Sequence, residues 1–121
     1  LGEYYWGSNG TVVRQVYNLQ VANSIQPDKK YVETSLDAIA HIFGRNLYGR
    51  SQVTGVGINP PMNPHDRRSG GDTVVDPWPG YLVGGGTKAT DWQDDWKSYS
   101  TNEVAINWQA ALVYALAWFI E

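Results

Sequence analysis

The chain has 121 residues, 42% of them hydrophobic, and its twelve acidic and nine basic side chains give a formal net charge of -3. This length suits one domain, and the apolar content excludes a disordered tail. The basic residues form no stripe or run. We therefore expect neither nucleic acid nor a membrane as a partner.

The residue types narrow the class of protein further. There is no cysteine, which excludes disulfides and thiolate metal sites. The first residues show neither a basic segment nor an apolar run, so no signal peptide is visible. Six Trp and eight Tyr stand against two Phe. Rings with a polar edge suit stacking on sugars or bases, and the negative charge favours sugars.

Three helices are predicted in chain order. The first covers about 11–25, with Ser8 or Asn9 as its N-cap, and the second covers about 31–43. The third, about 102–120, is apolar nearly all round, so we expect it to be buried on most sides. Its apolar stretch is slightly short for a membrane span and includes amide side chains, which favours a core helix.

Residues 45–101 show no sustained periodicity and hold most of the glycines and prolines. A loop of this length predicts a functional, site-building segment. The short turn near Pro27 makes the first two helices antiparallel neighbours. If the third helix packs antiparallel to the second, then Trp6, the loop and Glu103 share one end. The apolar third helix also indicates that the chain is part of a larger helical array.

A first polar cluster lies in this loop. Pro60, Pro61 and Pro64 restrict the backbone just ahead of His65. A fixed imidazole beside Arg67 suits hydrogen bonding to hydroxyls or to an anion. The alternative is a solvated surface loop.

A second cluster, residues 92–103, interleaves carboxylates with aromatic rings. This pattern suits sugar hydrolysis, in which one acid protonates the glycosidic oxygen while rings hold the substrate. However, Ser100 and Glu103 also have the spacing of a capping box, in which Glu103 would only bond its own helix start. A helix start stabilises an ionised carboxylate, so burial and the nearby Asp94 would have to keep the proton on Glu103.

Both segments resemble the two signature patterns of glycoside hydrolase family 9, the cellulase and endoglucanase family. The first pattern is met at Ser51, Val53, Thr54, Gly57, Asn59, Pro64, His65 and Arg67. The second is met at Trp92, Asp94, Tyr99, Glu103, Ala105 and Ala110, while Gln109 stands where the family usually has Asn. The similarity covers essentially the whole chain and is strongest to clostridial-type endoglucanases.

The resemblance implies a fold and a set of roles. It predicts an all-α chain: residues 1–121 would be the C-terminal part of the catalytic domain, forming the last three or so helices of an (α/α)6 barrel. Glu103 matches the general acid and Asp94 the accompanying active-site acid. His65 matches the active-site histidine, and Arg67 is expected to bind substrate hydroxyls. Trp6 is expected either to offer a stacking surface or to pack at the rim of the barrel.

The chemistry of the family requires no cofactor, but close relatives have a calcium site after the histidine. Here Asp72, with a carbonyl near Val75, matches the candidate calcium ligands, and a solvated loop aspartate is the alternative. A metallohydrolase built on His65, Asp66 and Asp72 is disfavoured because no helical or hairpin spacing would bring these side chains together.

The implied function is hydrolysis of β-1,4-glucosidic bonds in cellulose or related β-glucans with inversion. Inversion needs a second carboxylate, and the family's paired-aspartate motif is not found in this sequence. We therefore expect the chain to supply the general-acid half of the site. The chain is expected to associate with the missing N-terminal part of the barrel, or with a second copy of itself. The rival interpretation is a glucan-binding module without catalysis. Because polymeric cellulose cannot enter a cell, the resemblance also implies secretion.

Overall fold

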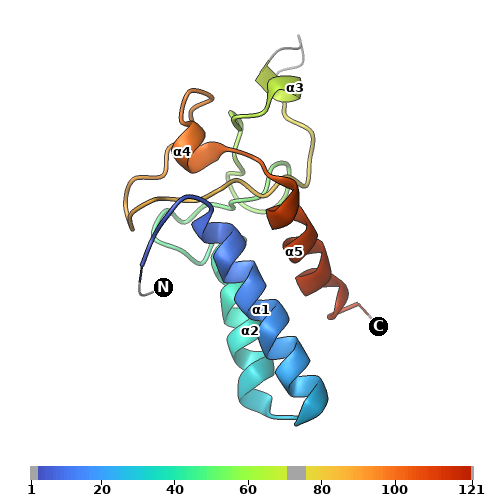
Figure 1. Ribbon diagram of the computed structural model, residues 1–121. Coiled ribbons are helices and arrows are strands. Elements are labelled where there is room, and N and C mark those ends of the chain that lie inside the picture. Colours follow the sequence, from blue (N-terminus) through green and yellow to red (C-terminus); the bar gives the residue numbers. More distant parts are fainter. Residues whose placement is uncertain (1–2, 71–75, 121) are drawn as a thin grey trace.

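The computed structural model describes residues 3–70 and 76–120, and it is helical. Its elements are α1 (Ser8–Ile25), α2 (Lys29–Ile42), α3 (Arg67–Gly70), α4 (Tyr99–Asn102) and α5 (Ile106–Ala117). The three long helices lie at one end, and the loop that carries α3 and α4 covers the other (Figure 1). The expected helical class is confirmed.

The α1–α2 hairpin begins differently from the prediction. α1 starts at Ser8 after Gly7, whose φ of 80° is left-handed, and no side chain caps it. The expected capping by Ser8 or Asn9 is wrong, because Asn9 is buried inside the helix and its amide donates to Gln52 Oε1 and the Val83 carbonyl. At α2, Asp28 is the N-cap and accepts a hydrogen bond from the Lys30 backbone at 2.8 Å.

The last helix packs against the first rather than the second. Over the described residues, the helix pairs in contact are α1 with α2 and α1 with α5. Trp108, near the start of α5, lies against Gly10 near the start of α1. Gln20, later in α1, donates to the Ala115 carbonyl at 2.8 Å. The two helices are therefore parallel, as expected, although α5 reaches this arrangement by packing on α1 and not on α2.

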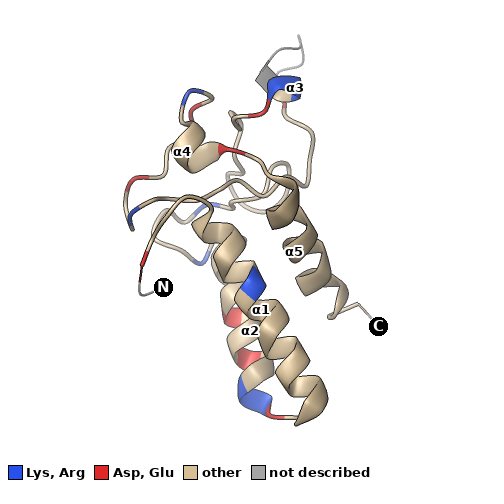
Figure 2. Ribbon diagram, viewed as in Figure 1, with Lys and Arg blue, Asp and Glu red and all other residues tan. Residues whose placement is uncertain are grey.

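α5 is shorter and more exposed than predicted. It begins at Ile106 rather than near 102, because residues 103–105 are extended. Only Trp108, Leu112 and Ala115 are buried on it, while Ile106 and Val113 are 88% and 66% exposed. The expected burial on most sides is therefore not found. The helix carries no charged residue (Figure 2), and large apolar side chains dominate its exposed face.

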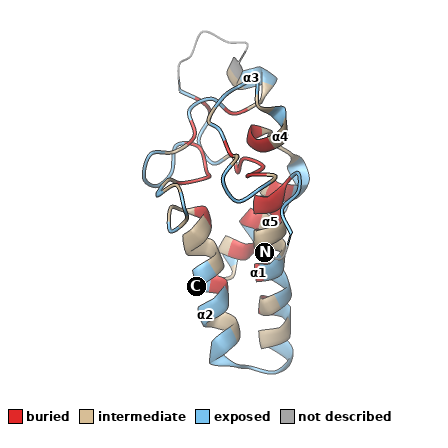
Figure 3. Cartoon of the chain, turned by 90° about the vertical axis from the view of Figure 1, so that its left-hand side faces the viewer, coloured by how far each residue is buried: buried red, intermediate tan, exposed pale blue. Residues whose placement is uncertain are grey.

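The core lies where the loop meets the helices, and the far ends of α1 and α2 are largely exposed (Figure 3). Its buried residues are Val13, Ile42, Val53, Leu82, Trp108 and Leu112. Isolated bridges join loop segments that are distant in sequence: Val53 with Leu82, Val83 with Val104, and His65 with Glu103. Across the described residues, no helix is both long and apolar enough to cross a membrane.

Candidate functional site

An open cleft of about 570 Å³ lies at the loop end of the molecule. It is lined by His65, Asp66, Arg67, Arg68, Trp96, Glu103 and Val104. Three residues singled out from the sequence, His65, Arg67 and Glu103, therefore meet at one surface, although up to 38 positions separate them. Trp96 also lines the cleft. It was not singled out from the sequence, although it belongs to the aromatic and acidic segment 92–103.

Glu103 is held by its backbone. It follows the short helix α4 in an extended conformation, and its carbonyl accepts from the Gly84 amide at 2.9 Å. It also forms a parallel bridge with His65. The capping-box interpretation is wrong, because Glu103 ends α4 rather than beginning a helix and Ser100 lies inside α4. Glu103 therefore lies at no helix N-terminus that would stabilise its ionised form.

Glu103 is partly buried, and its carboxyl has a specific partner among the described residues. Its Oε2 accepts a hydrogen bond from the Trp6 indole Nε1 at 3.0 Å. The Trp6 ring meets Trp108 edge to face, with ring centroids 4.8 Å apart, and remains 48% exposed. Trp6 therefore lies beside the acid, as the topology predicts, through a direct hydrogen bond that the sequence did not suggest.

His65 is fixed in position and in tautomer. Its backbone amide donates to the Asn102 carbonyl at 2.7 Å, and its Nδ1 bonds the Trp96 carbonyl. Because a carbonyl oxygen only accepts, we assign the hydrogen to Nδ1. In the neutral ring, Nε2 is then the acceptor. The imidazole also lies 5.2 Å from the Trp96 ring, centroid to centroid.

The two arginines of the cleft differ in their surroundings. Arg68 forms an ion pair with Asp66 at 3.0 Å and lies over the Tyr81 ring at 5.2 Å. The hydrogen bond to Asp66 raises the pKa of Arg68, so this guanidinium stays charged. Arg67 also lines the cleft. The cleft therefore combines two permanent cations with an imidazole and two carboxyl groups.

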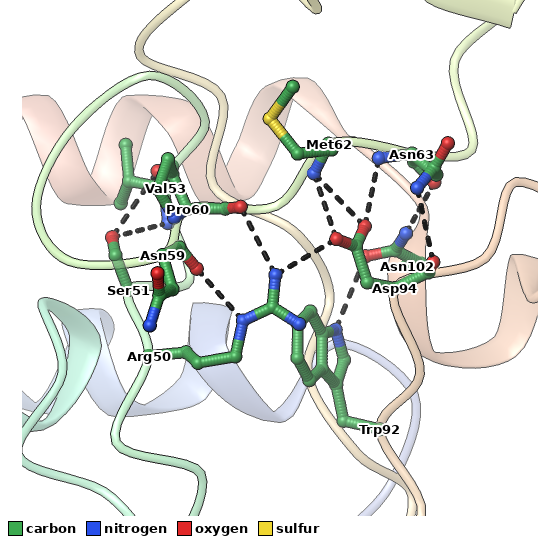
Figure 4. Close-up of polar contacts among 10 residues, drawn as sticks. All are labelled: Arg50, Ser51, Val53, Asn59, Pro60, Met62, Asn63, Trp92, Asp94 and Asn102. Carbon is green, nitrogen blue, oxygen red and sulfur yellow. Dashed lines mark hydrogen bonds and ion pairs between the residues drawn. The ribbon is translucent and has the colours of Figure 1, made fainter.

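Asp94 lies outside this cleft lining. Its carboxylate accepts from the backbone amides of Met62 and Asn63, at 2.8–3.1 Å, and from Arg50 at 3.0 Å (Figure 4). Its side chain is only 12% exposed. The structure thus places Asp94 behind the segment that leads to His65. Arg50 was missed from the sequence, where nothing distinguishes it from a surface arginine.

The remaining predicted site residues concern calcium. Asp72 and Val75 lie outside the described residues. Within the part that is described, no group of three or more His, Cys, Asp or Glu side chains is placed to hold a metal ion.

Gln109, the departure from the signature pattern, has a defined partner. Its Oε1 accepts from the Leu82 amide at 2.9 Å and its Nε2 donates to the Leu82 carbonyl at 2.7 Å. One side chain of α5 thereby satisfies both backbone groups of a buried loop residue.

A cleft that combines carboxyl groups, an imidazole, arginines and an exposed indole is typical of a carbohydrate-active enzyme. The family model described as glycosyl hydrolase family 9 matches residues 1–116, and the chain belongs to this family. It is 68% identical over 118 residues to Endoglucanase D of Acetivibrio thermocellus, covering 97% of this chain and 19% of that protein. The chain thus spans about a fifth of the length of this curated relative.

Solved structures agree with this assignment. The family 9 endoglucanase J30 superposes with a TM-score of 0.88 at 33% identity, covering 98% of this chain and 25% of that one. AaCel9A, solved in complex with cellobiose-like isofagomine, gives a TM-score of 0.86 at 32% identity and covers 93% of this chain and 25% of that one.

Proposed function

We propose that the chain supplies the general-acid half of an inverting site that hydrolyses β-1,4-glucosidic bonds in cellulose or a related β-glucan. The observation that carries this proposal is the cleft in which Glu103, His65 and Arg67 meet. The family membership supports it, as does the endoglucanase name of the relative with 68% identity.

In this mechanism the carboxyl of Glu103 donates a proton to the oxygen between two glucose units as the bond breaks. Trp6 donates to Oε2, which leaves Oε1 as the oxygen that carries the proton to the substrate. The Arg67 guanidinium and Nε2 of His65 hydrogen-bond sugar hydroxyls. Trp96, 41% exposed beside His65, offers a ring for a sugar to stack on.

The general base lies elsewhere in the assembled enzyme. In inverting glycosidases the two carboxyl groups stand about 6.5–9.5 Å apart so that a water molecule fits between the base and the sugar. Asp66, the other carboxylate of the cleft, is engaged by Arg68 and follows His65 directly in the chain. We assign the base to a partner segment that corresponds to the part of Endoglucanase D beyond the 19% matched here.

The outer face of α5 supports this assembly. Ile106, Val113 and Tyr114 are 88%, 66% and 50% exposed on a helix without charges. An apolar face of this kind drives association. We propose that it packs against the other helices of an (α/α)6 barrel, of which this chain forms one part. Action on a polymer places the assembled enzyme outside the cell. Structural calcium at Asp72 and Val75 stays a prediction from the resemblance.

The test uses a hybrid enzyme, Endoglucanase D in which this chain replaces the segment that it matches. We expect the hybrid to release reducing sugar from soluble β-glucan, and the Glu103→Gln variant to lose about 10²–10⁴-fold in kcat. Both forms are also run through a native gel that contains β-glucan. Retarded migration without sugar release in either form would instead support a glucan-binding module without catalysis.

A further inference from the structure

Arg50 is the centre of a polar cluster behind the cleft. Its Nε donates to the Asn59 carbonyl at 2.8 Å, and its Nη2 donates to the Pro60 carbonyl at 3.2 Å and to Asp94 at 3.0 Å. The guanidinium lies 5.2 Å from the centre of the Trp92 ring. Its side chain is 30% exposed. One cation therefore joins residues 59–60 to residues 92–94 of the loop (Figure 4).

Asp94 binds residues 62–63 of the loop segment that Arg50 contacts at residues 59–60. Oδ1 accepts from Asn63 at 2.8 Å and from Met62 at 3.1 Å, while Oδ2 accepts from Met62 and Arg50, each at 3.0 Å. Both oxygens of the carboxylate thus accept hydrogen bonds from N–H groups. A protonated carboxyl would lose acceptor capacity at one of these oxygens.

Residues 59–64 depend on these side-chain contacts because they form no helix or strand of their own. Residues 59–64 contain three prolines, which lack the N–H needed to pair with a neighbouring strand. Asn59 has a φ of 44°, a left-handed conformation that non-glycine residues rarely adopt. The Asn59 and Pro60 carbonyls and the Met62 and Asn63 amides are paired with side chains instead. Arg50 and Asp94 supply those partners.

The supported segment ends at His65, and from there the contacts reach the acid. The Asn102 side chain donates to the Asn63 carbonyl, and its backbone carbonyl accepts from His65. Trp92 Nε1 donates to Asn102 Oδ1 at 3.2 Å. Asn102 directly precedes Glu103. The position of the imidazole relative to the acid therefore depends on the cluster around Arg50.

We propose that Arg50 and Asp94 form a brace that positions His65 against Glu103, so that Asp94 acts by positioning and transfers no proton. This inference rests on the proposed hydrolysis at Glu103. A misplacement of about 1 Å in a catalytic group can cost about 10²-fold in rate. Losing either side chain of the brace therefore lowers kcat by up to about that factor.

The test compares Arg50→Met, Asp94→Asn and the double variant in the hybrid enzyme, with Glu103→Gln alongside. The brace predicts that both single variants lose similar factors in kcat, that the double variant is no worse than either, and that the pH profile keeps its shape. A D94N variant that falls to the level of E103Q while R50M keeps full activity would overturn it. Retained activity in E103Q would instead refute the proposed function.

Nuclear magnetic resonance of the chain alone provides a second test, which does not depend on catalysis. The chain has two histidines, so ring resonances report on each separately. The brace predicts that R50M, D94N and the milder R50K shift the ring resonances of His65 and leave those of His41 in place. It also predicts faster hydrogen exchange at the amides of Met62 and Asn63. Unchanged His65 resonances and unchanged exchange in all three variants would overturn the proposal.

The matched control is the Arg45–Asp37 ion pair, which joins the same residue types beside α2 with side chains 66% and 68% exposed. Exposed pairs contribute little. Arg45→Met and Asp37→Asn are therefore expected to leave kcat, the His65 resonances and the exchange rates unchanged. A loss of kcat in the control pair equal to that in R50M would show that the assay reports general destabilisation, and would refute the brace as the cause.

Discussion

Gly10→Ala separates helix propensity from packing at the α1–α5 contact. In an exposed helix interior this change stabilises by about 1 kcal/mol. Here the added Cβ would lie 2.1 Å from Trp108 Cδ1, whereas ordinary contact begins at 3.4 Å. Either the indole or α1 must then move by roughly 1.3 Å, the difference between these two distances. Trp108 is 1% exposed and has little room to move. Overpacking of this kind costs about 1–3 kcal/mol, so after the gain in helix propensity we expect a net loss of up to about 2 kcal/mol.

The assay is urea unfolding followed by tryptophan fluorescence, with Trp108→Leu as the background that removes the clash. Gly10→Ala should lower the free energy of unfolding in the native sequence and raise it by a few tenths to about 1 kcal/mol in the Trp108→Leu background. Equal effects in both backgrounds would refute the contact as the cause. Since Trp108 also packs on Trp6, Gly10→Ala should lower kcat in the hybrid as well.

Three further predictions concern single side chains. Trp6→Phe removes the hydrogen bond to Glu103, so kcat of the hybrid should fall about tenfold with KM unchanged; a raised KM with normal kcat would indicate a stacking role instead. Gln20→Leu leaves the Ala115 carbonyl unpaired and should cost about 1–2 kcal/mol in urea unfolding; unchanged stability would contradict this. Burial lowers the pKa of His41 below 6.5, so the unfolded chain binds more protons and stability should fall as the pH drops below 6.5. That acid loss should shrink in His41→Gln, and an identical pH dependence of the melting temperature in both forms would refute it.

Local chemistry explains the parts of the fold that the sequence predicted well. α2 was placed within two residues at its start because Pro27 and Asp28 end one helix and cap the next. The start of α5 was misplaced because residue 103 is extended by pairing with His65 and Gly84, which are distant in sequence. Ser8 and Asn9 carry a cap signal, but the tertiary partners of Asn9 overrode it.

The sequence also predicted part of the candidate site. The two signature patterns singled out His65, Arg67 and Glu103, and these do line one cleft. The surroundings of Asp94 were not predictable, because its partners include backbone amides that any residue type can offer. The donor to Glu103 was also missed, since an indole hydrogen bond between residues 97 positions apart has no pattern in sequence.

The most direct test of the account asks whether Glu103 transfers a proton. An aryl cellobioside with a highly acidic phenol as its leaving group needs no protonation, whereas β-glucan does. If Glu103 donates the proton, Glu103→Gln in the hybrid loses about 10²–10⁴-fold on β-glucan and keeps most of its activity on the aryl substrate. Equal losses on both substrates would contradict a proton-donating role for Glu103.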